Sequence, residues 1–133
     1  MEAAVLDTDV ISFIAKGDTR ASFYLPDLAD KRWCVCFQTV AELRLWEALR
    51  RWGPVRRKAV EGLLRHFVVL PYDSKMAQHW ADVIARRRRS GRPIECGDAW
   101  IAAAALRHDA SLLTHNAADY VDIPDLKVIS HRK

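Results

Sequence analysis

Short apolar runs alternate with longer, helix-like segments along this chain, and no other feature of the sequence constrains the fold as strongly. Each run is too short to be a buried helix, and the segment after it repeats apolar side chains at helical spacing. Strands that alternate with helices predict a parallel sheet with helices on both of its faces. We therefore expect an α/β fold, a three-layer α/β/α sandwich around a mostly parallel sheet of about five strands.

The apolar runs predict strands at residues 3–6, 33–37, 67–70, 111–114 and 127–129. A first helix should begin at a cap on Thr8 or Asp9 and end at Gly17. Further helices are expected at 19–29, from 43 to the Gly53-Pro54 break, from Pro54 to His66, from a cap at Asp73 or Ser74 through residue 89, and at 99–106.

The composition favours one domain, residues 1–133, that folds without disulfides. Cys34, Cys36 and Cys96 lack the spacing of a zinc site and are expected to be buried, reduced thiols. The chain has neither an apolar run of membrane-spanning length nor the features of a signal peptide, so we expect a cytoplasmic protein without membrane contact. The net charge of +4 favours a polyanionic partner.

Four acidic residues stand near the points where apolar runs give way to helical patterns: Asp7, Glu42, Asp98 and Asp119. In an open α/β sheet, ligands bind outside the carboxyl ends of the strands, so these acids can converge on one cleft. Carboxylates that converge repel one another unless a hard cation lies between them, and this predicts bound Mg²⁺ or Mn²⁺. Such a site favours metal-assisted chemistry on phosphate.

Each acid also has a purely structural explanation. Thr39 and Glu42 have the spacing of a T-x-x-E capping box, in which the carboxylate accepts a bond from the backbone N–H of Thr39. The helix dipole favours Asp98 near a helix start, and Asp7 could simply begin a turn. Local roles do not require all of the acids to fall at one rim of the sheet, so their joint placement favours a site.

Further polar residues lie beside these acids. Thr114 and Asn116 precede Asp119 and are expected to orient carboxylates or metal-bound waters, although turn chemistry explains them as well. Asp9 and Glu95 are candidate outer ligands, for which capping or solvent exposure is the favoured explanation.

The positive residues suggest two surfaces for RNA or a partner. The densest patch is made of Arg86, Arg87, Arg88, Arg89 and Arg92, which either bind RNA or form a solvated helix end. Trp46 and Trp52 share a segment with several arginines, a composition typical of base-stacking platforms and of docking surfaces. Burial is the leading explanation for Trp46, and Trp33, Trp80 and Trp100 are expected in the core.

Four blocks, LDTDVIS, TVAEL, GDAWIAAAAL and LLTHNAADY, closely resemble the signature blocks of PIN-domain ribonucleases, in particular VapC-type toxins of bacterial toxin–antitoxin pairs. The resemblance covers essentially the whole chain and implies a PIN-like fold. It implies that Mg²⁺ or Mn²⁺ is held by Asp7, Glu42, Asp98 and Asp119, with support from Thr114 and Asn116. His115 departs from the arginine that many relatives carry between those two residues.

The resemblance also implies an activity and partners. The protein is expected to hydrolyse phosphodiester bonds in structured RNA (tRNA, rRNA or mRNA), to leave 5′-phosphate ends and so to inhibit translation. A small VapB-type antitoxin would neutralise it, and a homodimer is expected. One alternative is a non-catalytic PIN-like RNA-binding domain, which should lack some of the acids. Another is a haloacid-dehalogenase-like phosphatase, suggested by Asp7-Thr8-Asp9 but lacking the later lysine and acidic pair of that family.

Overall fold

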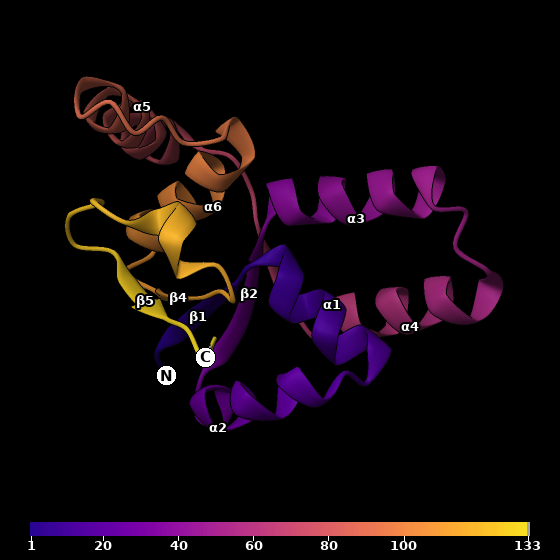
Figure 1. The fold of residues 1–133 in the computed structure, drawn as a ribbon. Coiled ribbons are helices and arrows are strands. Elements are labelled where there is room, and N and C mark those ends of the chain that lie inside the picture. Colours follow the sequence, from indigo (N-terminus) through magenta and orange to yellow (C-terminus); the bar gives the residue numbers. More distant parts are fainter. Residues whose placement is uncertain (133) are drawn as a thin grey trace.

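The computed structural model describes residues 1–132 and consists of one sheet with helices on both faces (Figure 1). The strands are β1 (Ala3–Leu6), β2 (Arg32–Cys36), β3 (Val68–Leu70), β4 (Ser111–Leu113) and β5 (Lys127–Ile129). The α-helices are α1 (Thr8–Lys16), α2 (Leu25–Leu28), α3 (Phe37–Leu49), α4 (Pro54–Leu64), α5 (Ser74–Arg89) and α6 (Cys96–Arg107). Two 3₁₀ helices are η1 (Thr19–Phe23) and η2 (Ala117–Tyr120).

The sheet has the strand order β3-β2-β1-β4-β5, and every neighbouring pair is parallel. The expected three-layer α/β/α architecture is confirmed, and the sheet is fully rather than mostly parallel. The chain builds β2 and β3 on one side of β1 and then returns to add β4 and β5 on the other. Strand order therefore reverses between β1 and β4, which is where open α/β sheets form ligand-binding crevices.

Alternate side chains of the strands pack into two apolar cores, one on each face of the sheet. On one face, Val5, Cys34 and Leu112 pack with α5 and α6, whose alanines at 102–105 are fully buried. On the other face, Leu6, Val35 and Leu113 belong to a core shared with the helices between residues 8 and 64. Two buried faces explain why the strands are apolar throughout.

Several helix ends follow the predicted local chemistry. Asp73 caps α5 by accepting a bond from the backbone N–H of Met76 at 2.7 Å. Pro54 occupies the first turn of α4, where its missing N–H costs nothing. Gly17 ends α1 with φ of 68°, a conformation that glycine adopts without strain.

The expectation of one helix at 19–29 is wrong, because η1 and α2 are separate short helices that meet at Tyr24. Pro26 lies in the first turn of α2 and has no N–H with which to continue a helix from η1. Phe37 and Thr114, expected to end strands, lie outside them, and Phe37 begins α3. Cys96 is exposed, whereas Cys34 and Cys36 are buried as expected.

Among the residues described, no helix is both long and apolar enough to cross a membrane.

Candidate active site

Asp7 lies at the point where strand order reverses. Its backbone N–H donates to the carbonyl of Leu113 at 2.8 Å, which joins the carboxyl ends of β1 and β4. Its side chain is only 8% exposed and accepts bonds from the Thr8 N–H and from the Thr114 hydroxyl, both at 2.8 Å. The structure therefore brings Thr114 directly against the first of the candidate acids.

Tyr120 joins Asp7 to Asp98 and was not among the expected site residues. Its hydroxyl lies 3.0 Å from Asp7 Oδ2 and 3.3 Å from Asp98 Oδ1. The side chain is buried and comes from η2, whereas Asp98 lies in the first turn of α6. The only sequence signal was an aromatic hydroxyl immediately after Asp119, and a helix as short as η2 gives no periodicity from which to infer its direction.

Asp9 is bound into the same region more firmly than a helix cap requires. Its Oδ1 accepts from the Val10 N–H at 2.7 Å. Its Oδ2 accepts from the His115 N–H and from the Asn116 side-chain amide, both at 3.0 Å. Asn116 thus orients a carboxylate, and Asp9 belongs to the cluster although a capping role had been favoured for it.

Glu42 approaches from α3, but the expected capping box is absent. Helix α3 begins at Phe37, so Thr39 lies inside the first turn rather than at the cap, and its hydroxyl pairs with that of Thr8 at 3.1 Å. Glu42 instead accepts a bond from Gln38 Nε2 at 3.1 Å. Gly97 of α6 permits this approach, because a Cβ there would lie 2.9 Å from Gln38 Nε2 and 3.1 Å from Glu42 Oε1.

The charges of these acids act on one another. Burial raises the pKa of Asp98 to about 7, and the charges of Asp7, Asp119 and Glu42 add to the shift. Burial, followed by the charge of Asp7, raises the pKa of Asp9 to about 7. Burial also raises the pKa of Asp7, and the hydrogen bonds that Asp7 accepts partly oppose this rise. The ionised state is therefore disfavoured for Asp7, Asp9 and Asp98, and the charges of Glu42 and Asp119 act on the same cluster.

This donor set matches the chemistry of a hard cation. Carboxylate oxygens are the ligands preferred by Mg²⁺ and Mn²⁺, and a bound cation would offset both the burial and the neighbouring negative charges that raise the pKa of Asp98. As the side chains stand in residues 1–132, however, no three Asp, Glu, His or Cys side chains are close enough together to hold a metal ion. Asp119 lies at the exposed rim of the cluster.

Glu95, the remaining candidate acid, and Arg87 of the arginine patch do not belong to the acidic cluster. Glu95 is exposed at the start of α6 and its side chain makes no capping bond. Arg87 is only 5% exposed and donates to the backbone carbonyls of Arg92, Asp119 and Val121. It fastens α5 to the segment that carries Asp119, so its assignment to an RNA-binding surface is wrong.

The remaining arginines are exposed. Arg86 forms an ion pair with Asp122 at 2.9 Å. The exposed side chains of the patch are Arg86, Arg88, Arg89 and Arg92. Trp52 is not available for stacking on RNA bases, because it is 8% exposed and belongs to the core with α1 and α4. Trp46 is half-buried, and Arg50 lies over its ring.

Known proteins resemble this chain along nearly its whole length. Residues 4–125 match the PIN domain family. Ribonuclease VapC4 of Mycobacterium tuberculosis is 34% identical over 131 residues, which cover 96% of this chain and 95% of that protein. The tRNA(fMet)-specific endonuclease VapC of Salmonella typhimurium is 29% identical over 125 residues, which cover 93% of this chain and 94% of that protein.

A solved structure supports the same assignment. DNA-bound VapBC from Salmonella typhimurium matches with a TM-score of 0.80 and 25% identity over 98% of each chain. The family match also decides against the phosphatase alternative. The chain belongs to the PIN-domain family, as a VapC-type ribonuclease toxin of a toxin–antitoxin system.

Proposed function

We propose that this ribonuclease is an endonuclease dependent on Mg²⁺ or Mn²⁺, with its site at the carboxyl ends of β1 and β4. The observation that carries the proposal is that the acids lie buried beside one another. The Tyr120 hydroxyl bridges Asp7 and Asp98, and burial, with added effects from the charges of Asp7, Asp119 and Glu42, raises the pKa of Asp98 to about 7. A divalent cation binds favourably between such carboxylates because its charge offsets the repulsion between them. The residues that would hold it are Asp7, Glu42, Asp98 and Asp119, with Asp9 beside them.

The neighbouring side chains fix the orientation of these carboxylates. Thr114 and Tyr120 donate to Asp7, Asn116 donates to Asp9, and Gln38 donates to Glu42. Each bond restricts the rotamers of a side chain that must meet a cation and a phosphate in one geometry. When bound, the metal would supply an acidified water and neutralise charge on the phosphodiester.

The proposed substrate is structured RNA, with transfer RNA as the leading class, since a relative of similar length is named a tRNA(fMet)-specific endonuclease. Cleavage of such RNA inhibits translation. The exposed Arg88 and Arg89 lie at the end of the helix that Arg87 fastens beside Asp119, and Arg92 lies in the segment that follows this helix, so all three are placed to contact RNA phosphates near the site.

The proposed partners are a small VapB-type antitoxin and a second copy of the chain. The matching VapBC structure supports the antitoxin, and its DNA-bound state suggests that DNA contact belongs to the complex. An aromatic surface supports a homodimer: Tyr72 is 61% exposed and packs edge-on against Trp100, which stacks on Trp80. We propose that residues 1–133 act as one domain in these assemblies.

The test is cleavage of purified tRNA with and without added Mg²⁺ or Mn²⁺. Asp98→Asn should abolish cleavage, whereas Asp30→Asn, which removes an exposed charge in the turn before β2, should not. In cells, induction should produce new 5′-phosphate ends that are missing with Asp98→Asn. RNA binding without cleavage by the folded wild-type protein at any metal concentration would favour the non-catalytic alternative.

A further inference from the structure

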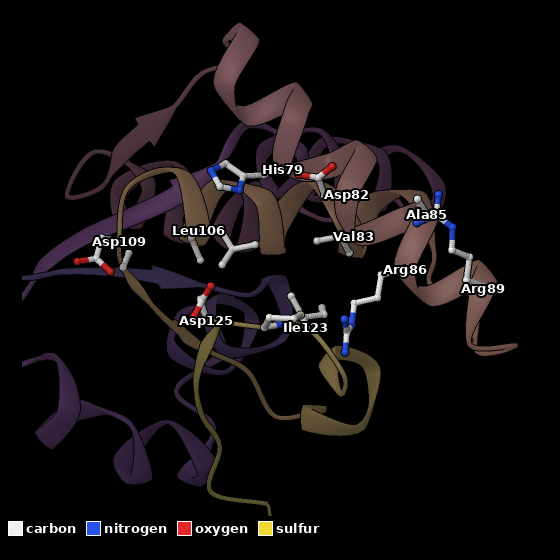
Figure 2. Close-up of a pocket in the computed structure, with 13 residues that line it drawn as sticks. His79, Asp82, Val83, Ala85, Arg86, Arg89, Leu106, Asp109, Ile123 and Asp125 are labelled. Carbon is white, nitrogen blue, oxygen red and sulfur yellow. The ribbon is translucent and has the colours of Figure 1, made fainter.

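A cavity of about 650 Å³ lies away from the acidic cluster, between α5, the end of α6 and the segment that leads into β5 (Figure 2). None of the clustered acids lines it. Its floor is apolar and includes Val83, Leu106 and Ile123. This volume is within the range of sites for small ligands, which are mostly apolar with a few polar groups that fix orientation.

Most of the charged residues of the cavity are divided between its ends. Arg86 and Arg89 lie toward one end, and Asp109 and Asp125 lie toward the other (Figure 2). Asp82 lies on α5 between the two ends, and its carboxylate accepts a bond from Gln78 Nε2 at 3.0 Å. A ligand complementary to the cavity therefore has an anionic group at one end, an apolar body, and hydrogen-bond donors at the other end.

Two of these charges are uncommitted. Arg86 is held by Asp122, and Asp109 pairs with Lys127 at 3.1 Å. In residues 1–132, by contrast, the side chains of Arg89 and Asp125 form neither an ion pair nor a hydrogen bond. Asp125 also has a φ of 68°, a conformation uncommon outside glycine.

We propose that this cavity binds a guanine nucleotide, with the phosphate at the uncommitted Arg89 and beside Arg86, the purine against the apolar lining, and the base edge at Asp125. Arginine suits phosphate because its planar donors match the phosphate oxygens. Guanine presents a ring N–H and an amino group side by side, which a single carboxylate accepts as a pair. Adenine places an acceptor where guanine has its ring N–H, so it would meet the carboxylate of Asp125 with repulsion.

The position of the cavity links it to the RNA. Arg87 lies between the cavity-lining Arg86 and Arg89 and donates to the carbonyl of Asp119, so the basic end of the cavity is the end fastened to the acidic cluster. An RNA strand bound at the acids can therefore place an unpaired guanine in the cavity, as RNA-binding proteins do with splayed bases. This source rests on the proposed function, whereas a free guanine nucleotide presents the same chemistry.

The test is titration of Asp98→Asn protein with GMP, AMP and UMP in the absence of metal, followed by amide NMR spectra. The inactive variant and the missing metal keep this measurement independent of cleavage. GMP should shift the signals of the segments around 79–89, 105–110 and 123–125, and should bind about tenfold more tightly than AMP or UMP. Equal responses to all three nucleotides, or shifts confined to other regions, would overturn the proposal.

Matched variants separate the two ends of the cavity. Asp125→Asn keeps a residue that tolerates positive φ but removes the charge, so it should abolish the preference for GMP. Arg89→Gln should weaken the binding of GMP, AMP and UMP alike, because contacts with the phosphate do not distinguish one base from another. Lys75→Gln is the control, since Lys75 is an exposed positive residue of the same helix that does not line the cavity. Unchanged GMP affinity in both cavity variants would contradict the assignment.

A final arm distinguishes the two sources of guanine. If the base belongs to RNA, a short guanine-containing oligoribonucleotide should bind more tightly than GMP, and Asp125→Asn in the active protein should change the positions of cleavage. If the ligand is a free nucleotide, GMP binds but Asp125→Asn leaves RNA binding and cleavage positions unchanged. GMP binding in a protein that cleaves no RNA would reject the proposed function and retain the cavity as a nucleotide site.

Discussion

The phenolic oxygen of Tyr120 lies 3.0 Å from Oδ2 of Asp7, at the carboxyl end of the central strand. Burial and the charges of Asp7 and Asp98 raise the pKa of Tyr120 far above its ordinary value. The hydroxyl therefore keeps its proton and acts only as a donor to the carboxylates. It links η2 to β1 and α6 by a contact that depends on one oxygen atom.

The first prediction is that Tyr120→Phe weakens both the fold and the activity. Loss of a buried bond to a carboxylate should cost about 1–3 kcal/mol in the free energy of unfolding. Because that bond lowers the pKa of Asp7, its loss should move the pH dependence of cleavage to higher pH. Denaturant unfolding and a pH–rate profile measure the two effects. Tyr72→Phe, at an exposed tyrosine, is the control and should change neither.

The second prediction concerns Gly97. Its replacement by Ala should leave the stability nearly unchanged, because the atoms a Cβ would meet belong to movable side chains of Gln38 and Glu42. Cleavage should fall, since those side chains must shift. Gly62→Ala has open space around the new methyl group and should stabilise α4 by roughly 0.5–1 kcal/mol without loss of activity. Full activity of Gly97→Ala would show that the position of Glu42 is not critical.

The sequence predicted the fold well because the signals for it are local. The apolar runs, the Asp73 cap and the Pro54 start depend only on neighbouring residues, and the structure retains all of them. Strand order is set by packing across the sheet, and the sequence gives no direct sign of the reversal between β1 and β4.

The site was predictable in outline for the same reason. Asp7 and Asp98 follow from their positions at strand and helix ends. Tyr120 acts through a contact with Asp7, 113 positions away, which no local pattern indicates. Gln38, by contrast, lies one helical turn before Glu42 on α3, and this spacing could have indicated the bond between them. The sequence has the spacing of a capping box at Thr39, but the box does not form. Helix α3 starts earlier, and the buried Thr39 hydroxyl bonds with that of Thr8 instead.

The third prediction is that Glu42→Gln keeps the fold and loses the metal response. A glutamine still offers an oxygen to Gln38, whose bond to Glu42 Oε1 is 3.1 Å. It removes a charge that raises the pKa of Asp7 and Asp98, so both pKa values should fall. Titration calorimetry with Mg²⁺ should show weaker binding, and cleavage should be nearly abolished. Glu47→Gln, on the same helix and paired with Arg44, should bind Mg²⁺ as the wild type does.

The fourth prediction is that Tyr24→Phe destabilises the loop that supports Asp7 and Asp9. The fully buried Tyr24 hydroxyl donates to the Thr114 carbonyl at 3.2 Å, accepts from the His131 N–H at 3.1 Å and lies 2.7 Å from His115 Nδ1. Its removal leaves buried groups unpaired and should cost about 1–3 kcal/mol in the free energy of unfolding. Unfolding in denaturant measures this, and an unchanged midpoint would show that the loop is held by other contacts.

The last prediction is that the metal-free protein loses stability as the pH rises from about 4 to 7. The folded pKa values of Asp9 and Asp98 are about 7 against 3.8 for the unfolded groups, so in this window the folded state binds more protons. Asp9 and Asp98 should therefore lower the melting temperature as the pH rises from about 4 to 7, and Asp98→Asn should make the melting temperature depend less steeply on pH. Mg²⁺ should raise the melting temperature more at pH 7.5 than at pH 5.5, because it binds the deprotonated cluster. Equal Mg²⁺-induced shifts at the two pH values would show that the cation binds elsewhere.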